Sequence, residues 1–182
     1  HRPCGHNSFR SCSSLPISWR CLRTTSVPLG NSLHRGTVLA KAASHALCDA
    51  IPDIPSTVLQ QALDEYPDLD DVDEEHVEMW MASTKSLLKL TDEDVQSSLR
   101  RHPWLLLADP GTMRTRVTAL SRVLSAEESQ VARAAVSHPD VLELSPMHVM
   151  EQLLYVSGTT ALSYDTVVAL ALSCPTLMCA EP

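Results

Sequence analysis

The segment Leu99–Leu107 reads Leu-Arg-Arg-His-Pro-Trp-Leu-Leu-Leu and joins an amphipathic stretch to a short apolar run through Pro103. Proline ends a helix because its ring clashes with the preceding turn and it has no backbone N–H. The same arrangement returns 36 residues later at Pro139 and again at Pro175, and it also stands 36 residues earlier at Pro67. A fixed period of this length predicts an array of repeated structural units.

Residues at fixed distances from these prolines are similar from unit to unit. The positions eight and four residues before each proline lie on one helix face, because their spacing is four residues. A second set, 10, 14, 17 and 21 residues after the proline, is apolar or threonine and defines the face of a second helix. The columns include Leu59, Val95, Val131 and Val167; Leu63, Leu99, Ala135 and Ala171; and Met113, Val117, Leu120 and Leu124 with their counterparts.

Polar side chains mark where the second helix of each unit begins. Asp73, Asp109 and Ser145 stand six residues after the repeat proline and are favourable N-caps. A proline follows Asp109 and Ser145 at the first helical position, where its missing N–H costs nothing. Gly158 suits the C′ position after the end of one of these helices.

The first helix of each unit has start signals of its own. Thr91 and Ser163 are N-cap candidates, and Ser125–Glu128 has the form of a capping box. Ser56 or Thr57 can cap the first helix. The sequence therefore predicts an all-α fold, a superhelical solenoid of two-helix repeats of about 36 residues. Helices are expected over 57–66, 74–88, 92–102, 110–124, 126–138, 146–157 and 164–174.

These features resemble the mTERF family, the mitochondrial transcription termination factors and their plastid relatives. The resemblance is carried by Leu99–Leu106, its echo Ser137–Leu142 and the polar helix start Thr91–Val95. It covers residues 57–182 and is fairly specific, because tetratricopeptide, ankyrin and HEAT repeats have other periods. It implies an mTERF-like superhelix that binds nucleic acid, double-stranded DNA included, in an organelle. The implied role is regulation of transcription, its termination included, or of another step of organelle gene expression.

Residues 1–48 differ in composition from the rest of the chain. They contain six Lys or Arg and no Asp or Glu, and they are rich in serine. This composition is typical of an organelle transit peptide, and a basic disordered tail on a cytosolic protein is the alternative. The hydroxyl content and Val38–Ala40 slightly favour a chloroplast, while the arginines suit a mitochondrion equally. Residues 49–56 contain two prolines and are expected to be a linker.

The end of the chain interrupts the repeat pattern. Pro182 stands one residue after the cap column of a fourth unit, before that unit's second helix. Because a solenoid needs terminal units that cover its apolar ends, we interpret the chain as a fragment with an incomplete last unit. The apolar helix expected over 164–174 should be buried or covered by a further unit. No stretch is long and apolar enough to span a bilayer, so no membrane partner is expected.

Charge is unevenly distributed over residues 49–182. They hold all 22 acidic residues and only eight Lys or Arg, a net charge of −14, which argues against indiscriminate binding to phosphate backbones. All eight basic residues lie between Lys85 and Arg133, so a local basic stripe can still contact a few phosphates. The candidate nucleic-acid-binding residues are Arg100, Arg101, Arg114, Arg116, Arg122 and Arg133.

The arginines also have a structural interpretation. Arg100 and Arg101 end a helix, where positive charge suits the helix dipole without any ligand. Arg114, Arg116 and Arg122 are expected to face solvent on the side of their helix away from Met113. An ordinary solvated face is therefore the alternative to a phosphate-binding stripe.

The other polar groups have structural interpretations. Residues 68–78 hold seven acidic groups where a helix begins, which suits the helix dipole, and they lack the glycine of a calcium loop. His102 and His138 precede repeat prolines and are expected to pack or cap. Neither a phosphate loop, nor a nucleophile elbow, nor a zinc-ligand spacing of the cysteines is present. We therefore expect no enzyme, no catalytic or metal-binding residue and no cofactor.

Two functional classes follow from the sequence. The first is a regulator whose partners are organellar DNA or RNA and proteins of organelle gene expression, as the resemblance implies. The second is a helical-repeat scaffold that binds proteins without binding nucleic acid directly, which the acidic surface would suit. Basic further units would favour the first class, and acidic ones the second.

Overall fold

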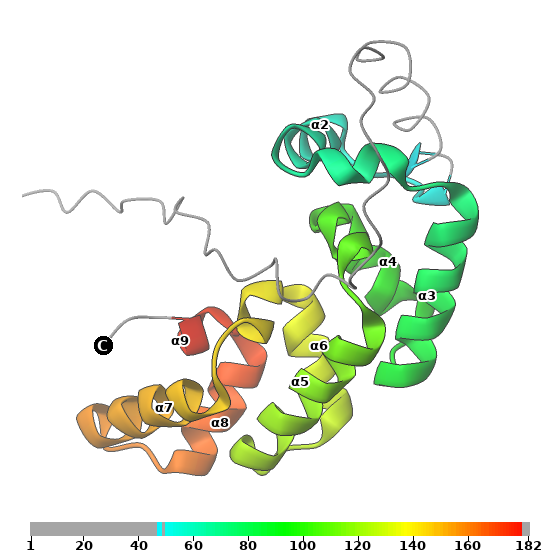
Figure 1. The fold of residues 1–182 in the computed structure, drawn as a ribbon. Coiled ribbons are helices and arrows are strands. Elements are labelled where there is room, and N and C mark those ends of the chain that lie inside the picture. Colours follow the sequence, from blue (N-terminus) through cyan, green and yellow to red (C-terminus); the bar gives the residue numbers. More distant parts are fainter. Residues whose placement is uncertain (1–46, 49, 180–182) are drawn as a thin grey trace, which may run out of the picture.

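The computed structural model describes residues 47, 48 and 50–179, which form helices and no strand. Figure 1 shows the helices following one another along a curve from α2 to α9. Within these residues, no helix has the length and apolar character that a bilayer span requires. The longer helices are α2 (Ser56–Glu65), α3 (Glu74–Leu88), α4 (Asp92–Arg101), α5 (Pro110–Leu124), α6 (Glu128–Ser137), α7 (Pro146–Thr160) and α8 (Tyr164–Ser173). The short ones are η2 (Pro67–Asp71), η3 (Pro103–Leu107), η4 (Pro139–Leu142) and α9 (Thr176–Cys179).

All seven expected helices are present, and their ends agree with the expected ends to within three residues. The largest difference is at α7, which continues through Gly158 to Thr160. The prediction that Gly158 follows the helix end was therefore wrong. A single glycine inside a helix costs only about 1 kcal/mol, so the packed helix tolerates it.

The predicted N-caps of the second helices are confirmed. The side chains of Asp73, Asp109 and Ser145 each accept a hydrogen bond from the backbone N–H three residues further on. Thr91 and Ser163 cap α4 and α8 in the same way. These caps satisfy N–H groups that have no partner inside the helix.

Two N-cap predictions were wrong. Pro55, not Ser56 or Thr57, occupies the N-cap position of α2. The expected capping box Ser125–Glu128 is absent, because Ser125 ends α5 in a left-handed conformation and α6 begins only at Glu128. Glu127 precedes α6 without a capping hydrogen bond from its side chain.

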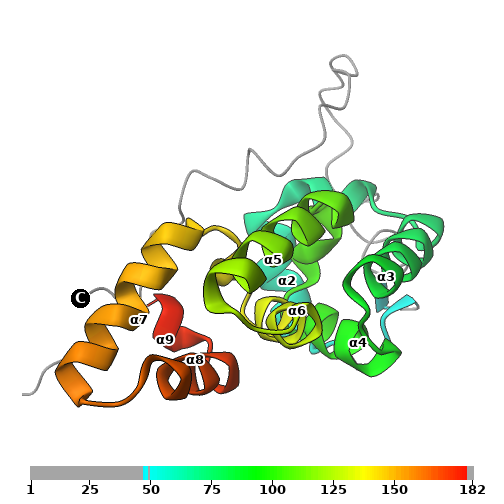
Figure 2. The ribbon, with the colours of Figure 1, turned by 90° about the horizontal axis from the view of Figure 1, so that it is seen from below.

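Equivalent helices of neighbouring units pack on one another. Helix α3 packs against α5 and α5 against α7, while α4 packs against α6 and α6 against α8. Figure 2 shows the two sets from a second direction. The column Leu59, Val95, Val131 and Val167 is at most 4% exposed, and Leu99, Ala135 and Ala171 are fully buried. Leu63 is only partly buried, and in α8 Leu170 is exposed while Val167, Val168 and Ala171 are buried.

A left-handed backbone conformation recurs every 36 residues at Asp53, Lys89, Ser125 and Ala161, with φ between 51° and 65°. Three of these residues follow the ends of α3, α5 and α7. After two of them the next N–H bonds the carbonyl five residues earlier, from Leu90 at 3.2 Å and from Ala126 at 3.1 Å. This pattern is a Schellman motif, whose left-handed position glycine usually fills; here Lys89 and Ser125 fill it.

Asp53 extends the recurrence into the segment that was expected to be a linker. Leu47 and Ile51 are at most 1% exposed, and the N–H of Ile51 donates to the Leu47 carbonyl at 2.9 Å. Ile54 packs against the core as well. The apolar side chains of this segment therefore pack on the helical body, while Pro52 and Asp53 are exposed. Nearly all of the predicted transit peptide, residues 1–46, lies outside the described residues.

The uncapped start of α6 gives a first prediction. Glu127→Asp keeps the charge but shortens the side chain, so its carboxylate can accept from the Ser129 N–H, while the Gln130 N–H already donates to the carbonyl of residue 127 at 3.0 Å. We expect the free energy of unfolding to rise by about 0.5–1 kcal/mol, the usual contribution of an N-cap. Urea denaturation measures it, and Glu127→Gln, which adds no cap, is the control. An equal effect of both substitutions would contradict the prediction.

Candidate nucleic-acid interface

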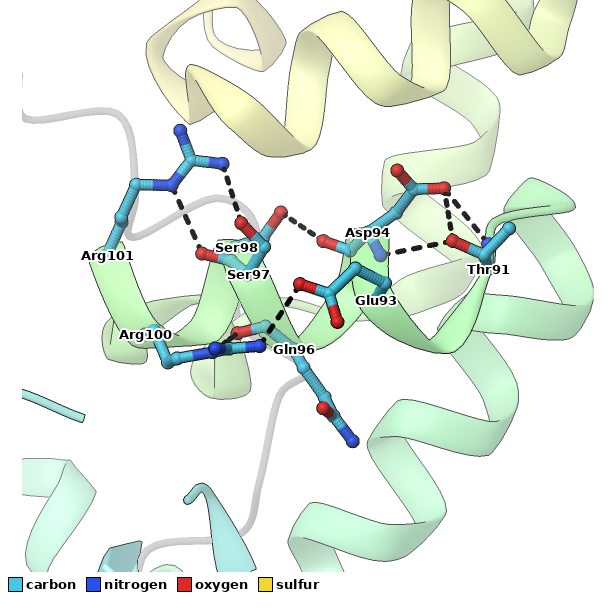
Figure 3. A network of polar contacts seen from close by, with 8 residues as sticks. All are labelled: Thr91, Glu93, Asp94, Gln96, Ser97, Ser98, Arg100 and Arg101. Carbon is cyan, nitrogen blue, oxygen red and sulfur yellow. Dashed lines mark hydrogen bonds and ion pairs between the residues drawn. The ribbon is translucent and has the colours of Figure 1, made fainter. Parts of the chain in front are cut away.

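The two arginines at the end of α4 bind back onto their own helix (Figure 3). Arg100 donates from Nε to the Gln96 carbonyl at 3.4 Å and from Nη2 to Glu93 Oε1 at 3.3 Å. Arg101 donates from Nε to the Ser97 carbonyl at 3.1 Å and from Nη2 to Ser97 Oγ at 3.4 Å. Both Nε contacts go to carbonyls one turn back that already accept from within the helix, so they hold each guanidinium group against α4 without capping its last carbonyls. The positive charge at this helix end suits the helix dipole, as the alternative interpretation predicts.

The other acidic side chains at the start of α4, Asp92 and Asp94, have partners other than these arginines. Thr91 and Asp94 form a capping box, in which Asp94 Oδ2 accepts from the Thr91 N–H at 3.1 Å and from its hydroxyl at 2.7 Å. Asp92 forms an ion pair with Lys85 of α3. The carboxylates of this helix thus have local partners, which reduces their repulsion of an anionic ligand.

The three arginines of α5 do not form one exposed face. Arg114 and Arg122 are exposed as expected, but Arg116 is half-buried, so its prediction as a solvent-facing residue was wrong. Arg116 occupies the column of Trp80 and Gln152, both 5% exposed. Helix α5 packs between α3 and α7, and these neighbours cover the column. The expectation for Arg116 came from the apolar face of α5 alone and took no account of neighbouring helices.

Arg101 and Arg133 line one cleft of about 130 Å³ between α4 and α6. Arg133 is exposed and makes no ion pair within the described part of the chain. Ser97 and Ser137 line the same cleft, as do Glu93 and Asp94. The fold therefore brings two arginines of neighbouring units, 32 residues apart in sequence, to one opening wide enough for a small anionic group.

The serines of this cleft were not singled out as site residues. Ser97 stands 36 residues before Arg133, and Ser137 stands 36 residues after Arg101. One repeat column thus holds serine in α4 and arginine in α6, and the other holds arginine in α4 and serine in α6. Because α4 packs on α6, equivalent columns lie side by side, and this exchange was the available sequence signal.

The six candidate arginines fall into two groups. Arg101 and Arg133 belong to the packed first helices α4 and α6, whereas the α5 arginines belong to the second helices. Arg100 is 28% exposed at its side chain and paired with Glu93. The structure therefore places Arg101 and Arg133 at one cleft, with Arg114 and Arg122 as separate exposed charges.

His102 packs in an aromatic cluster. The rings of Tyr66 and Trp104 stack with centroids 5.8 Å apart, and His102 meets Trp104 edge-on at 5.9 Å. Burial lowers the pKa of His102 from its ordinary value, against the opposing contact with the Ser137 backbone. His138 ends α6 in nearly the same backbone conformation as His102 ends α4. Packing and capping therefore account for both histidines.

Within the described residues, no group of three or more His, Cys, Asp or Glu side chains is placed to hold a metal ion. Cys174 and Cys179 are free thiols, and burial raises the pKa of Cys179 to about 11. The chain matches no protein-family model, and neither the curated proteins nor the solved structures yield a match.

Proposed function

We propose that this chain is an mTERF-like superhelical array that binds organellar nucleic acid and regulates transcription termination or another step of organelle gene expression. The array interpretation is supported by N-caps, pre-proline helix ends and left-handed turns that recur every 36 residues. It is also supported by the stacking of α3, α5 and α7 and of α4, α6 and α8. The composition of residues 1–48 supports import into a chloroplast or mitochondrion.

The observation that carries the binding proposal is the cleft shared by Arg101 and Arg133. Phosphate groups pair with guanidinium groups through short charge-assisted hydrogen bonds. The Ser97 hydroxyl, which accepts from Arg101, adds one neutral donor, whereas the other serine hydroxyls at the cleft donate to backbone carbonyls. Arg114 and Arg122 add further exposed positive charge on α5. Such contacts position a nucleic acid without reading its sequence.

A salt titration of binding to duplex DNA and RNA tests the proposal. Arg101→Ala/Arg133→Ala should weaken binding to all sequences alike and reduce the slope of log affinity against log salt by about two for duplex DNA. Lys85→Gln/Lys89→Gln removes the same charge away from the cleft and is the matched control.

The control should change the slope of log affinity against log salt by less than about 0.9, which is the change expected for one lost phosphate contact. Equal losses in the two double variants would show that binding follows net charge and not the cleft. If the wild-type chain binds neither polymer at low salt, where electrostatic attraction is strongest, the proposal fails.

A further inference from the structure

A second cleft, of about 600 Å³, lies where η2 and α3 meet η3 and α5. Its lining includes the indole of Trp80 and the apolar side chains of Val72 and Leu107. The carboxylates of Asp68 and Asp71 also line it. The opening thus combines an apolar wall with negative charge, and it shares no residue with the cleft of Arg101 and Arg133.

Hydrogen bonds between two units fix the walls of this acidic cleft. The indole N–H of Trp80 donates to the Ala108 carbonyl at 2.8 Å, and His76 Nε2 lies 3.0 Å from the Leu106 carbonyl. Asp109, at the mouth of α5, accepts from the Thr112 N–H at 2.7 Å. The contacts of Trp80 and His76 join α3 to the segment before α5, so the cleft exists before any ligand arrives and costs little to order.

Among the described residues, the acidic cleft is lined by three carboxylates, those of Asp68, Asp71 and Asp109. Residues 49–84 contain 11 Asp or Glu and no Lys or Arg. Neither lysine nor arginine is among the residues that line the cleft. Hydrogen bonds from Thr112 lower the pKa of Asp109, which keeps that carboxylate ionised. A cationic partner is attracted to such a surface, and an anionic one, such as a nucleic acid, is repelled.

We propose that the acidic cleft docks a basic segment of a partner protein. The carboxylates of Asp68 and Asp71 pair with its Lys or Arg heads, and the aliphatic stems of those side chains pack against Trp80 and Leu107. Long basic side chains favour this combination, because they bury their methylene groups while the charged end stays near water. The proposal is independent of nucleic-acid binding, because it uses other residues and the opposite charge.

Binding of a fluorescein-labelled oligolysine peptide to the full chain, followed by fluorescence anisotropy, tests this proposal. Asp68→Asn/Asp71→Asn should weaken binding about fivefold or more, the sum of two surface ion pairs. Glu75→Gln/Glu78→Gln removes the same charge from exposed positions of α3 outside the cleft, and should weaken binding less than about twofold. Asp71→Asn alone should give an intermediate loss, and thermal unfolding monitors the fold of each variant.

Carbodiimide coupling of carboxylates to lysine amines locates the bound peptide. Asp68 or Asp71 should be the coupled residue, and excess unlabelled oligolysine should abolish the product. The proposal is overturned if both double variants lose equal affinity, because binding then follows net charge alone. It is also overturned if coupling joins the cleft to Lys41 of the same chain, or if the wild-type chain binds no peptide at low salt.

Discussion

Leu99→Ala is expected to lower the free energy of unfolding by about 2–5 kcal/mol, the range for removing a buried leucine side chain. Leu99 is fully buried in α4, and it occupies the repeat column four residues before Pro103. The substitution removes buried apolar contacts and leaves a cavity, because helices held on several sides relax only partly. Equilibrium unfolding in urea, followed by circular dichroism, measures the loss.

Leu154→Ala is the matched control for Leu99→Ala. It makes the same chemical change on α7, where Leu154 is 51% exposed, and should cost less than about 0.5 kcal/mol. A loss below about 0.5 kcal/mol at Leu99 would mean that the repeat columns do not form the core. Equal losses at the two positions would lead to the same conclusion.

Trp80→Phe is expected to lower the free energy of unfolding by about 2–4 kcal/mol, because a lost buried hydrogen bond adds to a cavity. Trp80 is 5% exposed, and its indole N–H donates to the Ala108 carbonyl at 2.8 Å. Phenylalanine keeps an aromatic ring but provides no donor, so the carbonyl of Ala108, itself 3% exposed, loses its partner.

The preceding residue of α3 supplies the control for Trp80→Phe. Met79 is 58% exposed, and Met79→Leu should change the free energy of unfolding by less than about 0.5 kcal/mol. A correspondingly small effect of Trp80→Phe would show that the contact between α3 and the start of α5 contributes little. That result would also weaken the case for a preformed acidic cleft, which has Trp80 in its wall.

Only part of the candidate interface could be predicted from the sequence. The sequence predicted either a structural role for Arg100 and Arg101 at the helix end or phosphate binding. Their contacts with carbonyls four residues earlier follow from local helix geometry. The burial of Arg116 was not foreseen, because it depends on the helices on either side of α5. That Arg101 and Arg133 line the same cleft depends on the packing of α4 on α6.

The sequence by itself determined the helices, most of their caps and the apolar columns that became the core. The signals for these features act within about one helical turn: a proline that stops a helix, a side chain that caps one, or apolar residues on one face. They therefore do not depend on the rest of the fold. The helices that begin at Glu74, Asp92, Pro110 and Tyr164 were placed in this way.

The tertiary structure alone decided which residues meet across units. It placed Leu47 and Ile51 in the core, covered part of Arg116 and formed the two clefts. These features depend on the distance and angle between helices that are far apart in sequence. Packing sets both quantities, and helical periodicity specifies which face is buried without specifying what that face will touch.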